Sequence, residues 1–206
     1  MAKGLHGYDP LFKVHYPLHV FMKGRMSAWI AGQHVTIDGN MIKYMGHAVS
    51  FVKYMPAKPI KHGIKVFALC CTMPAVLLGF YVYCGKEEEV DGGTVNIVTN
   101  WFFEVSITGQ RGQVLHTNNY YTSVKLVKRI FVKYGWTIIG MILTTDKKSH
   151  QDKDIPFLKL SNGARNSIKR GWYRDAVIKL KTPSVKKYYV QCTTWCDKKT
   201  SLLFEF

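Results

Sequence analysis

The chain has 206 residues, 47% of them hydrophobic and 14% aromatic, which is enough to bury the core of one main domain. Its 29 Lys and Arg residues outnumber its 13 Asp and Glu residues, so the formal net charge is +16. No apolar run is long enough to cross a bilayer, and the first residues lack the apolar stretch of a secretory signal. We therefore expect an intracellular protein with neither a membrane partner nor a small-molecule substrate. The charge favours nonspecific binding to nucleic acid, with a merely basic surface as the alternative.

The five cysteines are too few and too irregularly spaced for a disulfide framework, so we expect them to be reduced. Cys70 and Cys71 lie in an apolar run, where cysteine usually packs as a small core residue. Cys192 and Cys196 have three residues between them, a spacing that could suit a metal, but no second Cys or His pair follows. Strand residues of a sheet are the interpretation favoured for this pair.

The first part of the chain predicts a strand and a hairpin after a leading segment, residues 1–33, that has no assigned element. Residues 34–42 are rich in β-branched side chains, which favours a strand. A basic stretch with two prolines, residues 53–61, precedes two apolar runs, residues 63–71 and 75–83. Their short connection indicates a hairpin.

Helices and strands alternate in the next part of the prediction. Residues 95–109 lack the alternation of a strand and favour a helix, and residues 113–117 are short and extended. Residues 122–134 place apolar side chains at helical spacing, and residues 136–143 indicate a buried strand. Together with the strand and hairpin before them, these elements predict an α/β domain with a mixed sheet.

The second of these helices has clear end signals, because Thr122 or Ser123 can cap its start and Gly135 can stop it. A polar, basic segment without a clear period follows. Three strand-like runs then predict a small antiparallel sheet. They are residues 176–180, 187–193 and 201–206.

Asp38 is conspicuous because only it and Asp9 carry a carboxylate before the run Glu87–Glu89. It lies inside the predicted strand 34–42, where a carboxylate is costly to bury unless it is paired or binds a metal. Asp38 is therefore a candidate functional residue.

Several segments, taken in order, resemble the piggyBac transposases. Residues 8–14 are similar to the family's YDPLYKV motif, and residues 35–42 to its first catalytic-aspartate strand, IDEAMI. Residues 54–66 match its YMPxKPxKxGIKxW signature almost residue for residue. Residues 81–86 resemble the YTGK strand end, and residues 118–123 the DNxxTS segment that bears the second aspartate. The wording is most like that of the vertebrate piggyBac transposable element-derived proteins.

The resemblance implies a ribonuclease-H-like DDE transposase core, a mixed sheet with flanking helices, followed by a small antiparallel β insertion region. It places a partial core at residues 34–146 and a partial β-rich insertion at residues 147–206. In active relatives three acids hold two Mg²⁺ or Mn²⁺ ions that stabilise the attacking and leaving oxygens during phosphodiester cleavage. Asp38 matches the first acid, and the residue at position 118 should face it across the sheet.

The sequence departs from the family at the second acid position, where Asn118 offers a neutral amide. Gly39 replaces the acidic residue that usually follows the first aspartate, although that residue is not one of the three ligands. The family's third aspartate lies in a helix beyond the point where this sequence stops, at Phe206. With Asp38 as a weak metal ligand at best, we expect no resident cofactor and no strand cleavage.

The favoured hypothesis is a domesticated, catalytically inactive nuclear protein that binds DNA nonspecifically. Two alternatives stay open: a DNA transposase or nuclease, if the full gene supplies the missing acids, and a transposon remnant without function. Salt-dependent DNA affinity separates the first hypothesis from the last. The candidate DNA-binding residues are Lys53, Lys58, Lys61, Lys65, Lys125, Lys128 and Arg129.

Overall fold

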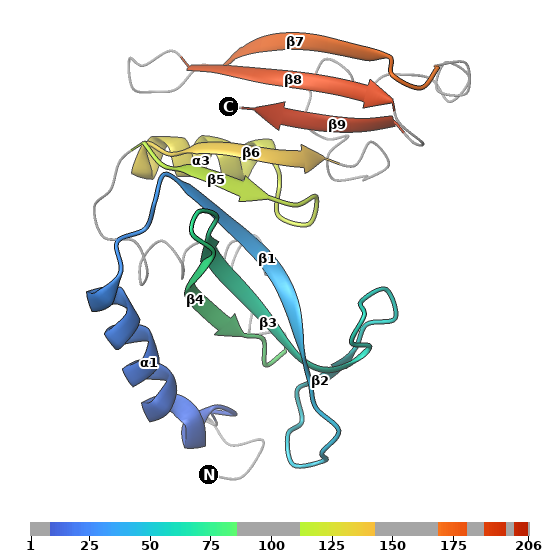
Figure 1. Ribbon diagram of the computed structural model, residues 1–206. Coiled ribbons are helices and arrows are strands. Elements are labelled where there is room, and N and C mark those ends of the chain that lie inside the picture. The colour runs from blue at the N-terminus through green and yellow to red at the C-terminus, as the bar shows by residue number, and fades with distance from the viewer. Residues whose placement is uncertain (1–8, 86–111, 143–168, 181–187, 197–199, 206) are drawn as a thin grey trace. The chain divides into compact units, whose positions relative to one another are not determined.

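The computed structural model describes residues 9–85, 112–142, 169–180, 188–196 and 200–205 (Figure 1). The chain divides into two compact units, Met1–Gly109 and Gln110–Phe206, and each is described by itself. None of the helices in the described part of the chain is long and apolar enough to span a membrane.

The first unit is built around strand β3 (His62–Cys71). Strand β1 (His34–Lys43) pairs with it antiparallel along one edge. On the other edge β2 (Val52–Tyr54) pairs with the start of β3, and β4 (Val76–Val82) pairs with the rest. The predicted strand and hairpin are confirmed, whereas β2 is an addition. Because β2 is only three residues long and lies in a stretch with two prolines, no periodicity marks it.

A helix also precedes this sheet, which the sequence did not predict. A single 3₁₀ turn, η1 (Phe12–Val14), leads into α1 (His15–Ala28). No side chain caps the start of α1, and its interior contains Gly24, which lowers helix propensity. Pro17 is tolerated because it lies in the first turn, where its missing N–H has no intrahelical acceptor.

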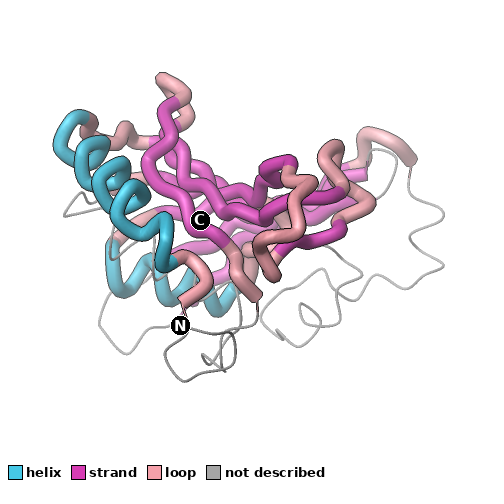
Figure 2. The backbone as a smooth tube through the Cα atoms, turned by 90° about the horizontal axis from the view of Figure 1, so that it is seen from below, coloured by secondary structure: helices cyan, strands magenta, loops and turns pink. Residues whose placement is uncertain are grey.

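Tertiary packing holds α1 in place. The Phe21 ring lies 5.9 Å from the Phe80 ring of β4, centroid to centroid, and Met22 is buried. Figure 2 shows α1 as a continuous helix beside the strands of its unit. The helix therefore depends on contacts with β4, which no local sequence signal reports.

The second unit begins with a strand–helix–strand crossover: β5 (Val114–Thr117), α3 (Val124–Tyr134) and β6 (Thr137–Ile142). The two strands run parallel, with Val114 opposite Thr137, as such a connection requires. All three elements confirm their predictions. The buried residues of the crossover form its core: Leu115, Tyr121, Leu126, Val127, Ile130, Trp136 and Ile138.

Helix α3 starts and ends where its sequence signals lie. The Ser123 Oγ accepts a hydrogen bond from the backbone N–H of Leu126 at 3.2 Å, which satisfies one of the free donors of the first turn. Gly135 adopts the left-handed conformation, with φ of 68°, and its N–H donates to the Phe131 carbonyl. Of the two predicted caps, Ser123 is therefore the one used.

Three further strands complete the second unit: β7 (Tyr173–Leu180), β8 (Tyr188–Cys196) and β9 (Thr200–Glu205). Their antiparallel pairing confirms the prediction. The sequence did not predict that β9 also pairs antiparallel with β6. The strands of this unit thus lie in the order β5-β6-β9-β8-β7.

Two parts of the sequence prediction lie outside the described residues. They are the helix expected at residues 95–109 and most of the polar segment that begins at residue 147. The expected boundaries at residues 34 and 147 between core and insertion stay predictions.

Candidate nucleic-acid interface

Asp38 lies in the middle of β1, opposite Ala68 of β3. Its side chain is half-buried, and its Oδ1 accepts a hydrogen bond from the Gly39 N–H at 2.7 Å. The carboxylate is thus partly desolvated and oriented by its own backbone. This placement suits a group that meets a charged ligand better than a residue of the apolar core.

Arg25 of α1 brings a positive charge to the same sheet, which the sequence reasoning missed. Its Nε and Nη2 are buried and have no hydrogen-bond partner among the described residues. Burial lowers the pKa of Arg25, and Cys70 of β3 opposes that shift. The pKa of the Cys70 thiol is raised by its own burial, lowered by Arg25 and raised by Asp38. Cys70 therefore lies within electrostatic reach of both side chains.

Asn118 follows β5 directly and forms a tight turn. Its side-chain Oδ1 accepts the Tyr120 N–H at 3.0 Å. Its backbone carbonyl accepts hydrogen bonds from the Oγ1 of Thr122 at 2.8 Å and from the N–H of the same residue at 3.2 Å. The amide oxygen that could face a metal is thus already an acceptor within the turn, a role that Asn and Asp fill equally well.

A buried pair of hydroxyls supports this turn. The Oγ1 atoms of Thr117 and Thr122 lie 2.9 Å apart, and both residues are buried. Gly140 of β6 leaves the space they occupy, because a Cβ built on it would overlap both hydroxyl oxygens. The end of β5 is therefore specified by turn chemistry and close packing.

Asp38 and Asn118 belong to different units, so their expected approach across the sheet stays a prediction. Among the described residues no three His, Cys, Asp or Glu side chains are grouped so that they could hold a metal ion. The described residues by themselves therefore do not supply the three acids of a two-metal centre.

Four of the predicted DNA-binding lysines are placed by β2, β3 and the turn between them. Lys53 lies in β2 and Lys65 in β3, and both are half-buried. Lys58 is half-buried in the connecting turn, where its N–H donates to the Met55 carbonyl at 3.1 Å. Lys61 precedes β3 and is exposed. Three of the four are therefore held against the sheet and one projects into solvent.

The three half-buried lysines converge around Phe67 and Tyr83. Lys65 Nζ lies 4.7 Å from the Phe67 ring centroid and 5.4 Å from that of Tyr83, while Lys53 Nζ lies 5.5 Å from the Tyr83 centroid. Such distances permit cation–π attraction to the rings. Lys58 Nζ donates to the carbonyl of Gly39 at 2.7 Å, and Gly39 is the residue of β1 opposite Phe67.

Pairing of the strands explains this convergence. Lys53 is opposite Gly63, two residues before Lys65, and the Tyr83 N–H donates to the Lys65 carbonyl at 2.9 Å. Residues two apart on a strand share a face. Burial lowers the pKa of Lys65, and Lys58 and then Lys53 lower it further. The amines are thus close enough to repel one another.

The remaining predicted basic residues lie on α3 of the second unit. Lys128 is half-buried and Arg129 is exposed, whereas the side chain of Lys125 lies outside the described part of the structure. The predicted basic residues therefore form two groups on separate units.

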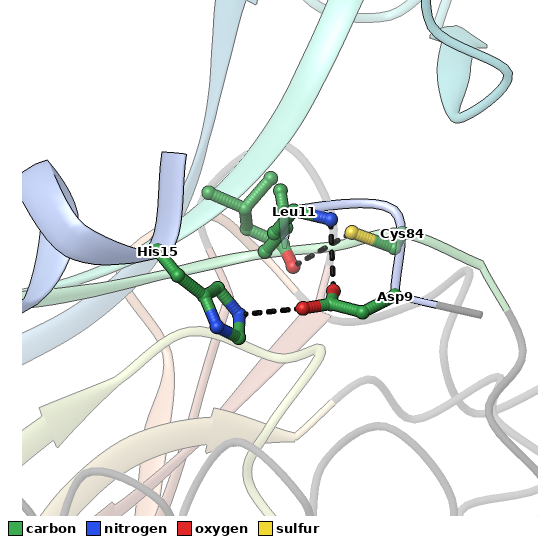
Figure 3. A network of polar contacts seen from close by, with 5 residues as sticks. Asp9, Leu11, His15 and Cys84 are labelled. Carbon is green, nitrogen blue, oxygen red and sulfur yellow. Dashed lines mark hydrogen bonds and ion pairs between the residues drawn. The ribbon is translucent and has the colours of Figure 1, made fainter. Parts of the chain in front are cut away.

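A separate cavity of about 360 Å³ lies between the start of α1 and β4 in the first unit. At its rim the Asp9 carboxylate pairs with His15 Nε2 at 3.0 Å and accepts the Leu11 N–H at 2.8 Å (Figure 3). The Cys84 Sγ lies in the same network and donates to the Val82 carbonyl. The Asp9 contacts tie the segment before α1 to the first residue of that helix.

The cysteine pair of β8 does not make a metal site. Cys192 and Cys196 are four residues apart on one strand, so their Cα atoms are separated by about 13 Å. Cys192 is fully buried, and burial raises the pKa of its thiol to about 12. The interpretation of Cys192 as a structural strand residue is supported.

A family model described as Transposase IS4 matches residues 2–192. The chain belongs to this transposase family. Among solved structures, that of a piggyBac transposase synaptic complex with hairpin DNA, determined by cryo-EM, is similar with a TM-score of 0.76. The two chains are 21% identical, and the similarity covers 96% of this chain and 38% of that one. No curated protein matches the chain.

These comparisons confirm two conclusions drawn from the sequence. The chain is a piggyBac-type transposase relative, and its fold class is the mixed sheet with flanking helices of the ribonuclease-H-like core. It spans less than half the length of the transposase that it resembles in structure.

Sequence reasoning found the lysines of this transposase relative but missed the side chains that organise them. Tyr83 and Phe67 were assigned only to strands, and Gly39 was noted only as a lost acid. No sequence signal marks Tyr83, because its place opposite Lys65 depends on the register between β4 and β3.

Proposed function

We propose that this transposase relative is a nuclear DNA-binding protein that does not cut DNA. Three observations support DNA binding: family membership, a net charge of +16, and lysines held together on the sheet of the first unit. The similar piggyBac structure is a complex with hairpin DNA, which adds support by analogy. The observation that carries the proposal is the convergence of Lys53 and Lys65 on the Tyr83 ring, with Lys58 bound to the neighbouring Gly39 carbonyl.

The contacts are to the phosphate backbone, so binding is independent of base sequence. Lysine is a compact point charge that neutralises phosphate without reading base edges. Release of condensed counterions makes such affinity fall steeply with salt. Lys61 of the first unit, and Lys128 and Arg129 of the second unit, supply further positive charge.

The proposed absence of cutting is supported by the residue at the second acid position, Asn118. Two divalent ions about 3.5–4 Å apart need several anionic ligands around them. Asn118 offers a neutral oxygen that already accepts the Tyr120 N–H. An amide at this position therefore removes one of the anionic ligands that the two ions would need.

Titration of a labelled duplex of arbitrary sequence at several salt concentrations tests DNA binding, with the purified chain and Mg²⁺ or Mn²⁺ in a parallel cleavage assay. We expect affinity that declines steeply with salt and no nicked product. Affinity that is unchanged between low and moderate salt would remove the electrostatic basis. Metal-dependent nicking that is lost in Asp38→Ala would favour the transposase or nuclease alternative, and absence of DNA binding at low salt would favour a non-functional remnant.

A further inference from the structure

We propose that Lys53, Lys58 and Lys65 together form a single binding site for one backbone phosphate of DNA, with Tyr83 as the residue that positions two of the three amines. This inference rests on the proposed DNA binding and goes beyond it, because it assigns three lysine ammonium groups to the same phosphate. A diffuse basic surface would instead place each lysine on a different phosphate.

The backbone brings the three side chains to one place from three separate elements. Lys53 comes from β2 and Lys65 from β3, and both amines lie within 5.5 Å of the Tyr83 centroid. Lys58 comes from the turn and is anchored by its hydrogen bond to the Gly39 carbonyl. An anchored amine loses little further freedom when it binds a ligand, which favours affinity.

The electrostatics favour an anion at this point. The like charges of Lys53 and Lys58 depress the pKa of Lys65, after the larger effect of burial. A phosphate between the amines would replace that repulsion with attraction, and partial burial weakens screening by salt and water. A phosphodiester oxygen pair accepts from several ammonium groups at once.

Tyr83 is the positioning residue. Its ring edge-packs on Phe67, with centroids 6.0 Å apart and planes at 81°, so the ring is fixed by the buried side chain of β3. Two ammonium groups lie near that fixed ring. Replacement of Tyr83 by Leu would keep an apolar side chain but remove the π face.

The first experiment measures duplex affinity against salt for the full chain and for Lys53→Gln/Lys58→Gln/Lys65→Gln. The matched control is Lys13→Gln/Lys23→Gln/Lys43→Gln, which removes the same charge from three exposed positions of the same unit. A single shared phosphate predicts that the slope of log K against log salt falls by about 0.9 in the cluster variant. Three independent phosphates would lower it by about 2.7.

Single substitutions sharpen the test. If the three lysines share one phosphate, each single Gln variant should lose most of the duplex affinity that the triple variant loses. The effects of the single substitutions on the binding free energy are then strongly non-additive. We expect each to weaken binding at least roughly threefold at low salt, and Tyr83→Leu to weaken it about two- to fivefold. Circular dichroism establishes that each variant is folded; if the triple variant is not, the singles and their doubles carry the same comparison.

Competition by inorganic phosphate identifies the source of the anion. At matched ionic strength we expect phosphate to displace the duplex no better than chloride does, because the site binds a phosphodiester within a larger electrostatic contact. Selective displacement would assign the site to free phosphate and overturn its assignment to DNA.

Two failures are distinguishable. Suppose that the unsubstituted chain binds the duplex. If the cluster variant then loses no more affinity than the control variant, or if its slope of log K against log salt falls by about 2.7, the shared site is wrong and DNA binding stands. If the unsubstituted chain does not bind the duplex at low salt, the proposed function itself is wrong and the site falls with it.

Discussion

The β5–α3–β6 crossover and the α1 region reach their structures by different routes. In the crossover, every local signal agrees: Ser123 caps the helix, Gly135 ends it, and Leu126, Val127 and Ile130 bury one face. Helix α1 lacks a capping side chain and depends on its packing against β4. The comparison teaches that the crossover is specified by local signals, whereas α1 is specified by its contacts with a distant segment of the chain.

The same contrast applies to Asp38 and Asn118, the two residues that the sequence resemblance places at acid positions. Asn118 is part of a turn that its own side chain closes. Asp38 lies in an extended strand whose neighbours are supplied by β3 and by the turn that carries Lys58. Asn or Asp at position 118 would therefore give the same local fold, since either residue can close the turn.

The largest loss of stability is expected for a substitution at Gly140, where β6 packs closely against the Thr117 and Thr122 hydroxyls. In Gly140→Ala the new Cβ overlaps the Thr117 and Thr122 hydroxyls, and neither can move without breaking the buried pair. Overpacking of this kind costs roughly 2–3 kcal/mol in free energy of unfolding. Urea unfolding measures it; a midpoint equal to that of the unsubstituted chain would show that the hydroxyl pair does not form.

The second effect removes the helix cap. Ser123→Ala deletes the acceptor for the Leu126 N–H and should destabilise the chain by about 1 kcal/mol. Ser123→Asp is the matched control, because it keeps an acceptor and places a negative charge at the helix start. Equal unfolding midpoints for the Ala and Asp variants would mean that the cap contributes nothing.

These residues also show how far the sequence alone could go. Helical spacing, a cap and a terminal glycine predicted α3. A β-branched run predicted β1, and two apolar runs with a short connection predicted β3 and β4, because in each case the signal is local. Helix α1 was missed since its stabilisation comes from the contact between Phe21 and Phe80. The pairing of β9 with β6 was missed because no residue in either strand encodes its partner.

The residues of the candidate site could be predicted from the sequence, but their grouping could not. Asp38 and the lysines stood out by their chemistry along the chain. Their grouping depends on register: Lys53 falls opposite Gly63, and Tyr83 falls opposite Lys65, because β2 and β4 share one edge of β3. Sequence patterns give the face of a strand but not its neighbours.

The third prediction distinguishes the contribution of Asn118 to stability from its contribution to metal affinity. Asn118→Ala loses the hydrogen bond to the Tyr120 N–H and should cost about 1 kcal/mol, whereas Asn118→Asp should change stability by less than about 0.5 kcal/mol. Calorimetric titration with Mn²⁺ should show higher affinity for Asn118→Asp, because an anionic oxygen is a better ligand for a hard cation. An Asp variant that is as unstable as the Ala variant would contradict the turn argument.

The smallest change in stability is expected in α1, and it tests whether this helix forms without strong local signals. Gly24 lies inside the helix, and a Cβ placed on it meets nothing within 4 Å. Gly24→Ala should therefore raise the free energy of unfolding by about 0.5–1 kcal/mol, chiefly because alanine restricts the unfolded chain. Gly135→Ala is the matched control: its Cβ also meets nothing within 4 Å, but its φ of 68° strains any residue with a side chain, so the same substitution should destabilise. Opposite signs in urea unfolding would establish that α1 forms in solution despite its weak local signals. A neutral or destabilising Gly24→Ala would show that the packing of Phe21 and Met22 does not hold residues 15–28 in a helix.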